Sequence, residues 1–232
     1  RFEYIYKFVT KARYQKGMGG GMLDEGTLYV ARFNDDGTGD WLALDIDDPD
    51  FLTAAVEAGV EFKDQADVLV NTRLAADVVG ATKMDRPEWG AVHPQTREVY
   101  MTMTNNTART EETDAANPRL RNATGHIIRW REQGNRAFAT KFDWDIFVLA
   151  GDAGLKNSQI LPETNGPALD ADNIFASPDG VWIDDNGILW IQTDMSGDQQ
   201  AGLKGNPNFG ENGMLAANPI TGEIRRFLSG PF

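Results

Sequence analysis

The sequence of 232 residues contains no cysteine and only two histidines. Without cysteine, disulfide bonds, thiolate metal sites and thiol nucleophiles are excluded within this chain. His93 and His126 belong to no recognisable zinc-binding or Ser-His-Asp pattern. No Gly-x-Ser-x-Gly, Walker or EF-hand motif occurs either. Carboxylate, amide and guanidinium groups are therefore the candidates for any chemistry.

Positive charge is also scarce, with 22 Lys and Arg against 35 Asp and Glu and a net charge of -13. Nucleic acids and anionic membranes bind basic surfaces, so we expect neither as a partner. No stretch approaches the ~20 apolar residues of a membrane span. Many of the surplus carboxylates are expected to form a solvated surface. The alternative is binding of a hard cation such as calcium, which prefers oxygen ligands.

Short apolar segments separated by Gly, Asp and Asn turns recur along the chain and predict β-strands. The clearest are residues 26–33, 98–103, 144–149 and 188–193. Residues 48–74 differ, because Asp48 suits an N-cap, Pro49 suits a first helical turn and the apolar spacing is helical. They predict a helical insertion with a break near Gly59. Residues 104–124 are polar and without period, so they predict a long loop, which in a compact domain is usually functional or disordered.

Two segments of the chain repeat one another. Residues 87–94 match residues 178–185, and after one inserted residue 99–102 match 189–192. Each unit reads proline, carboxylate, short strand, turn, strand, which is typical of β-propeller blades of ~40–50 residues. We therefore predict a mainly β fold built from propeller blades. The spacing places the two units in alternate blades, or in adjacent blades with a large insertion between them.

Glu88 and Asp179 occupy the same position in the two repeats, immediately before an inner strand. Loops that enter the inner strands of a propeller converge on its axis. Two carboxylates that converge in a confined site repel each other, and a bound cation relieves that repulsion. Glu88 and Asp179 are thus candidate metal ligands. The alternative for Asp179 is that its Pro-Asp-Gly sequence forms only a turn.

Arg86 precedes the first repeat by one residue and is the candidate catalytic residue. Its guanidinium could bind a phosphate through two parallel hydrogen bonds, or could serve as a counter-ion to Asp85 or Glu88. Asp172 and Asn173 lie just before the second repeat and are candidate oxygen ligands, or alternatively form an Asx turn.

Three further polar residues follow the inner strands of the repeats: Asn105, Asn106 and Asp194. Because they come after the strands and not before them, we expect them on the opposite rim or at a blade edge. Turn capping is their expected role there.

The chain resembles the PhoX family of bacterial alkaline phosphatases. The resemblance rests on the segment Met84-Asp85-Arg86-Pro87-Glu88-Trp89 and on several strand segments. These segments are residues 2–9, 26–33, 177–180, 189–194 and 225–231. They span nearly the whole chain in the family's order, and the Arg-Pro-Glu-Trp segment is the most specific.

The resemblance implies a monomeric phosphomonoesterase of the periplasm or outside the cell, exported by the twin-arginine route. It implies calcium and iron ions at the propeller axis. On this basis Glu88 and Asp179 are metal ligands, with Asp172 and Asn173 as further ones, and Arg86 contacts the phosphoryl group of the substrate.

The chain departs from the family in two respects. The family's metal site includes a cysteine thiolate, and the family is considerably longer than this chain. We therefore expect residues 1–232 to be part of a single β-propeller domain truncated at both ends. Such a fragment is expected to be inactive alone and to expose strand edges that another copy could cover. Two other functions stay open, a non-catalytic calcium-binding propeller and a lactonase-like metal-dependent hydrolase.

Overall fold

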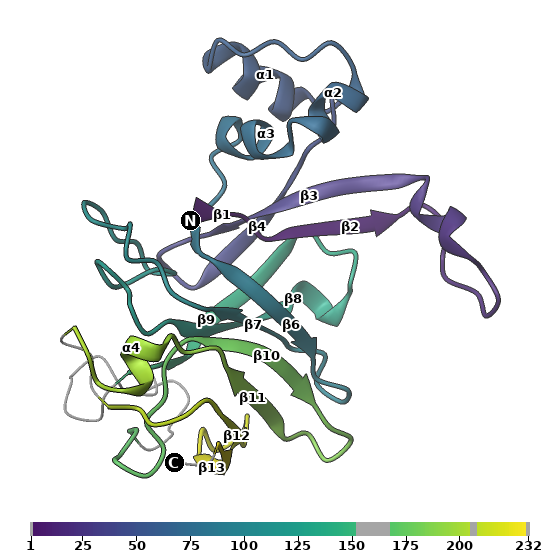
Figure 1. Cartoon of the computed structure of the whole chain (residues 1–232). Helices are drawn as coiled ribbons and strands as arrows, with labels where there is room; N and C mark the ends of the chain where they lie inside the picture. Colours follow the sequence, from purple (N-terminus) through teal and green to yellow (C-terminus); the bar gives the residue numbers. More distant parts are fainter. Residues whose placement is uncertain (1, 152–167, 205–207, 231–232) are drawn as a thin grey trace. The chain divides into compact units, whose positions relative to one another are not determined.

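The computed structural model describes residues 2–151, 168–204 and 208–230. The chain divides into two compact units. We call the first the hairpin unit, which consists mainly of the described residues within 84–131 and 144–232. The second, the helical unit, consists of residues 3–83 and 132–143. Both are drawn in Figure 1.

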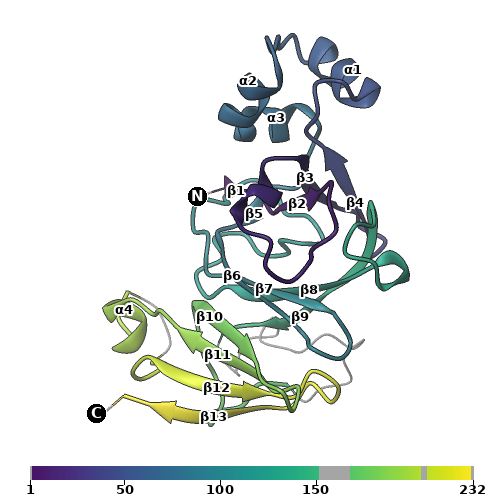
Figure 2. The ribbon, with the colours of Figure 1, turned by 90° about the vertical axis from the view of Figure 1, so that its right-hand side faces the viewer.

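The hairpin unit is built from two successive groups of strands. Within each group, strands that follow one another in the chain are neighbours in the sheet (Figure 2). The first group comprises β6 (Pro87–Val92), β7 (Val99–Met103), β8 (His126–Glu132) and β9 (Lys141–Leu149). The second comprises β10 (Pro178–Ile183), β11 (Leu189–Thr193), β12 (Gly213–Ala217) and β13 (Ile224–Ser229). The unit also contains β5 (Met84–Asp85) and α4 (Gly197–Gln200).

The mainly β fold class is confirmed, and β10–β13 form a sheet of four strands, the number found in one propeller blade. Most predicted strands are present, but β12 was missed. Its sequence contains Gly213, Ala216 and Ala217, which have low strand preference. It forms because Leu215 and Ala217 become fully buried beside β11. Closure of the blades into a ring stays a prediction.

The predicted repeat is confirmed by strand register. Pro87 pairs with Met103 in the first hairpin as Pro178 pairs with Thr193 in the second, and both hairpins have a bulge directly after the proline. The two hairpins belong to consecutive groups of strands, and Thr102 Oγ1 in β7 donates to the carbonyl of Asp179 in β10 at 2.8 Å. The two hairpins therefore lie in neighbouring groups of strands, which favours the second predicted arrangement, adjacent blades with an insertion.

The core of the hairpin unit lies between these strands. Tyr100 packs edge-on against Phe147, with ring centroids 5.5 Å apart, and Leu189 and Ile191 of β11 are fully buried. Alternation along β7 and β11 sends these side chains to the interior, and burial of each large side chain contributes about 1.5–3 kcal/mol.

The helical unit joins a small antiparallel sheet to three short helices. Its strands are β2 (Tyr6–Thr10), β3 (Gly26–Phe33) and β4 (Thr38–Ala43). Its helices are α1 (Pro49–Glu57), α2 (Gln65–Val70) and α3 (Thr72–Val78). The one-turn helices η1 (Gly20–Leu23) and η2 (Gln133–Asn135) also lie in it, and the short strand β1 (Phe2–Glu3) has one residue in each unit.

The predicted helical insertion is confirmed, although it forms three helices and continues to Val78. Asp48 caps α1 as expected, because its side chain accepts hydrogen bonds from the backbone N–H groups of Asp50 and Phe51. Gly59 has a φ of +66° and ends this helix. In the described ranges no helix combines the length and the apolar character needed to cross a membrane.

Candidate active site at the entry to two equivalent hairpins

Arg86 and Ser177 precede the two equivalent prolines and share a strained backbone. Their φ angles are +54° and +50°, a left-handed backbone conformation that residues other than glycine rarely adopt. The carbonyl of Arg86 accepts from the N–H of Thr104 at 3.1 Å, and the carbonyl of Ser177 accepts from the N–H of Asp194 at 2.9 Å. The two hairpins therefore begin with the same turn, and strain of this kind is often found at functional sites.

This turn places the residue after each hairpin beside the residue before it. Because the strands are antiparallel, Thr104 and the next residue, Asn105, return to the side of Arg86, and Asp194 returns to the side of Ser177. Of the two predicted places for Asn105 and Asp194, the opposite rim or a blade edge, the opposite rim was wrong for that reason. Both line the same pocket as Arg86.

Arg86 is held on two sides. Its Nη1 donates to Oδ1 of Asn105 and its Nη2 donates to Oε1 of Glu88, both at 3.0 Å. The Arg86 side chain nevertheless remains 38% exposed. Its role as a counter-ion to Glu88 is thus observed, and its guanidinium is also accessible to a ligand.

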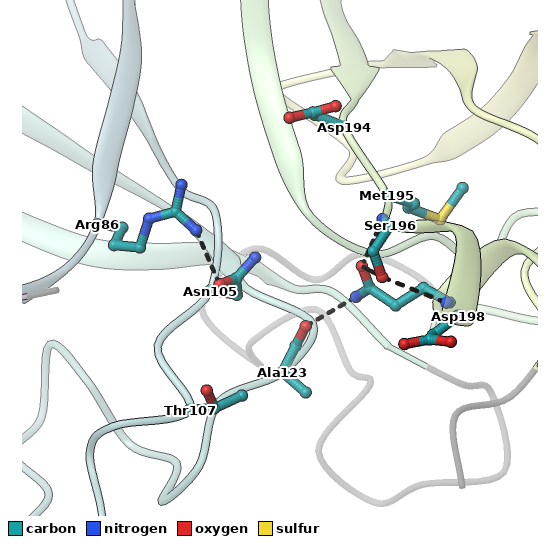
Figure 3. A pocket seen from close by; sticks show the side chains of 9 residues that line it. Arg86, Asn105, Thr107, Ala123, Asp194, Met195, Ser196 and Asp198 are labelled. Atoms are coloured by element: carbon teal, nitrogen blue, oxygen red, sulfur yellow. Dashed lines mark hydrogen bonds between the residues drawn. The ribbon is translucent and has the colours of Figure 1, made fainter. Parts of the chain in front are cut away.

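The pocket beside Arg86 has a volume of about 410 Å³ and a mostly polar lining (Figure 3). The other residues that line it are Asn105, Thr107, Ala123, Asp194, Met195, Ser196, Asp198 and Gln199. In the view of Figure 3, Arg86 and Asn105 lie on one side and Asp194 and Asp198 on the other.

Gln199 fixes one wall of this pocket. Its side chain is buried, its Nε2 donates to the carbonyl of Ala123 at 2.8 Å, and its Oε1 accepts from Ser177 Oγ at 3.1 Å and from the N–H of Ser196 at 3.0 Å. Ser196 and Gln199 also form a capping box at α4. The wall is therefore held by hydrogen bonds within the protein itself.

Asp179 lies where negative charge accumulates. Burial raises its pKa above the ordinary value, and the neighbouring charges of Glu88 and Asp194 raise it further, while Arg86 opposes the shift. This shift favours the predicted convergence of Glu88 and Asp179, which stays a prediction. Asp194 belongs to the same group, which sequence reasoning missed.

Carboxylates in such an environment have the chemistry of ligands for a hard cation. Among the described residues, however, no three His, Cys, Asp or Glu side chains gather closely enough to hold a metal ion. Glu88 and Asp179 therefore fit part of a metal shell and do not complete one.

Asp172 and Asn173 lie elsewhere, in a second pocket of about 320 Å³. Asn173 Nδ2 donates to the carbonyl of Ile224 at 2.9 Å, and Ile224 begins β13 at the end of the sheet away from Pro178. The N–H of Asp172 donates to Oδ1 of Asp170 at 2.9 Å, as in an Asx turn. The structure does not bring these two residues together with Arg86.

The predicted long loop, residues 104–124, contains no helix or strand, yet it is highly organised. Polar side chains buried beneath it form one hydrogen-bonded network around Asp85, Asn106, Arg109, Asn122 and His126. The only hint in the sequence is the unusual density of Asn and Arg in the loop.

Comparisons with known proteins agree with this architecture. A family model described as "Alkaline phosphatase PhoX" matches residues 1–232. A solved structure described as Pseudomonas fluorescens PhoX in complex with vanadate, a transition state analogue, is 42% identical and superposes with a TM-score of 0.83. That similarity covers 100% of this chain and 41% of the other, so this chain spans less than half the length of its relative. No curated protein matches. The chain belongs to the PhoX family of alkaline phosphatases.

Proposed function

We propose that the protein to which this chain belongs is a phosphomonoester hydrolase, and that the pocket beside Arg86 receives the phosphoryl group. The observation that carries the proposal is the Arg86 guanidinium, held by Asn105 and Glu88 and still accessible from the pocket. A planar donor fixed in this way suits the oxygens of a phosphate. Vanadate bound to the P. fluorescens relative supports the same chemistry.

In this proposal the residues of this chain bind and orient. Arg86 would hold the phosphoryl group and stabilise the negative charge that develops on its oxygens. Asn105 would keep the guanidinium in place. PhoX phosphatases depend on metal ions, and we propose calcium and iron, with Glu88 and Asp179 supplying some of the ligands. When bound, such ions neutralise phosphate charge and activate an attacking oxygen.

Asp172 and Asn173 remain proposed ligands only of an ion separate from the Arg86 pocket. Both residues line the second pocket, together with Asp170 and Glu223. Elemental analysis of an Asp172→Asn variant would show whether any bound calcium depends on this position.

Replacement of Arg86 tests the proposal directly. In the intact protein, Arg86→Ala should lower kcat/KM for p-nitrophenyl phosphate by about 100-fold or more and leave the metal content unchanged. Arg97→Ala is the matched control, since Arg97 also has a positive φ but is exposed in the turn at the other end of the hairpin. Full activity of Arg86→Ala would refute the assigned role. Hydrolysis of lactones in place of phosphomonoesters would favour the lactonase alternative, and metal binding without hydrolysis the non-catalytic one.

We further propose that the intact protein is monomeric and lies in the periplasm or outside the cell after twin-arginine export. The acidic composition and the family resemblance support this. Light scattering would measure the mass, and fractionation of cells with and without a functional twin-arginine system would locate the protein. Activity confined to the cytoplasm in both strains would contradict the proposed route.

A further inference from the structure

Asp85 is a fully buried carboxylate directly before Arg86. It receives three hydrogen bonds, which come from Asn106 Nδ2 at 3.0 Å, Arg109 Nε at 2.8 Å and Asn122 Nδ2 at 3.0 Å. The Arg109 side chain is only 7% exposed, so the two charges neutralise each other in the interior. A buried carboxylate is stable only with such compensation, because desolvation of an unpaired charge is very costly.

The three donors come from both ends of the loop formed by residues 104–124. Asn106 and Arg109 belong to its first part and Asn122 to its last, and the N–H of Asn106 donates to the carbonyl of Asn122 at 2.6 Å. The Asp85 carboxylate therefore closes the loop at its base.

The residues that line the pocket are direct neighbours of these donors. Asn105 and Thr107 flank Asn106, and Ala123 follows Asn122. A shift of either donor would carry its neighbour with it, because consecutive Cα atoms are joined by a rigid peptide unit.

The backbone around Asp85 is fixed as well. Its N–H donates to Oδ1 of Asn117 at 3.0 Å, and the following residue, Arg86, accepts from the N–H of Thr104 through its carbonyl. The left-handed φ of Arg86 is thus supported from both sides, as strained conformations require.

We infer that Asp85 is a positioning residue for the phosphoryl site: its buried carboxylate holds the ends of the loop and so the position of Asn105, and its backbone N–H holds the chain directly before Arg86. The inference rests on the proposed function. It predicts that substitution of Asp85 weakens the binding of phosphate in variants that still fold, because Arg86 and Asn105 are displaced.

The test uses the intact protein and Asp85→Asn, which keeps the size of the side chain but turns an NH₂ group toward donors. We expect kcat/KM for p-nitrophenyl phosphate to fall about 10- to 100-fold, because small misplacements at a reacting centre have effects of that size. Inhibition by inorganic phosphate should weaken in parallel. Asp145→Asn is the control, since it disrupts another carboxylate–arginine pair, with Arg129, which also donates to the carbonyl of Pro219.

A double-mutant cycle separates positioning from a general loss of stability. Adding Asn105→Ala should lower phosphate affinity substantially in the wild-type and Asp145→Asn backgrounds, and less than about 2-fold in the Asp85→Asn background, because the position of Asn105 is already lost there. Equal effects in all three backgrounds would overturn the inference.

Asn122→Ala provides a second route if Asp85→Asn does not fold, because it removes one donor and leaves the charge pair intact. It should weaken phosphate inhibition by about 10-fold in a folded protein. Suppose that the wild-type protein is active and that a folded Asp85→Asn or Asn122→Ala variant keeps its activity and its inhibition by phosphate within about 2-fold. That result would overturn the inference about Asp85 and leave the proposed function standing. A wild-type protein that neither hydrolyses the ester nor binds phosphate would refute the proposed function as well.

Discussion

Arg86 and Ser177 are equivalent residues of two hairpins, with left-handed φ angles of +54° and +50° and carbonyls that each accept from the residue after the returning strand. One hairpin carries a guanidinium at this position, and the other carries a buried hydroxyl that donates to Gln199 at 3.1 Å. The same backbone conformation thus presents the guanidinium that we propose to bind phosphate in one repeat, and holds the pocket wall in the other.

The strain at Arg86 predicts an unusual order of stability. Arg86→Gly should be more stable than Arg86→Ala by about 1 kcal/mol, because alanine keeps a Cβ in the left-handed region and glycine does not. Urea unfolding of both variants of the intact protein measures the difference. At Arg131, an exposed position in β8, the order should be reversed by about 0.5–1 kcal/mol. The same order at both positions would contradict the argument.

The burial of the His126 ring predicts that the protein loses stability in mild acid. The ring is fully buried, its Nε2 donates to the carbonyl of Ala116 at 2.9 Å, and its Nδ1 accepts from Asn122 at 3.2 Å. Burial, with help from the charge of Arg119, lowers the pKa of His126 to about 3. The unfolded chain protonates this histidine near its ordinary pKa of 6.5 and the folded protein does not. The free energy of unfolding should therefore fall as the pH drops from 6.5 toward 3, by up to about 1.4 kcal/mol per pH unit.

Urea midpoints at pH 7.5, 6 and 5 measure this effect. His126→Gln keeps one donor and one acceptor but cannot be protonated, so its stability should depend less on pH in this window. Parallel profiles for the two proteins would show that another group is responsible.

The buried ion pair of Lys7 and Glu132 in the helical unit predicts a large coupling energy between the two residues in the free energy of unfolding. Lys7 Nζ donates to Glu132 Oε2 at 3.0 Å, Trp41 Nε1 donates to the same oxygen at 3.1 Å, and both charged side chains are at most 15% exposed. Glu132→Leu or Lys7→Met alone should cost about 3–5 kcal/mol, because each leaves a buried charge without its partner. The double variant should lose much less than the sum of the two.

Chemical unfolding of the single and double variants gives the coupling energy. The exposed pair of Arg73 and Glu3, at 62% and 43% exposure, is the control and should couple by less than about 1 kcal/mol. A coupling no larger at Lys7 than at Arg73 would contradict the prediction.

The contact between Arg129 and Asp145 predicts that replacement of Arg129 in β8 by lysine lowers the stability of the protein. Nε and Nη2 of Arg129 donate to the two oxygens of Asp145 at 2.6 and 2.7 Å, and the pair raises the pKa of Arg129 further above its ordinary value in spite of burial. Arg129→Lys keeps the charge but loses the two-pronged contact, so the protein should lose about 1–2 kcal/mol of stability. Thermal unfolding checks this against Arg131→Lys, an exposed position expected to lose less than about 0.5 kcal/mol. Equal losses at the two sites would argue against the role of geometry.

Much of the fold followed from local patterns in the sequence. The strand at residues 26–33, the start of α1 at Asp48 and Pro49, and the equivalence of the two hairpins were all predicted. Each depends on side-chain alternation, capping or turn chemistry within a few residues. β12 was missed because its strand state depends on burial against β11 and not on its own preferences.

The sequence by itself determined the family and the two equivalent hairpins, because these are written in short contiguous segments. It also singled out Arg86, Glu88 and Asp179 as candidate site residues. Only the tertiary structure decided which groups gather around Arg86. Asn105 and Asp194 reach the pocket through strand pairing, and Asp85 holds Asn122 from 37 positions away in the chain. It also separated Asp172 and Asn173 from that pocket. Contacts between distant residues depend on the packing of whole elements, which local patterns do not specify.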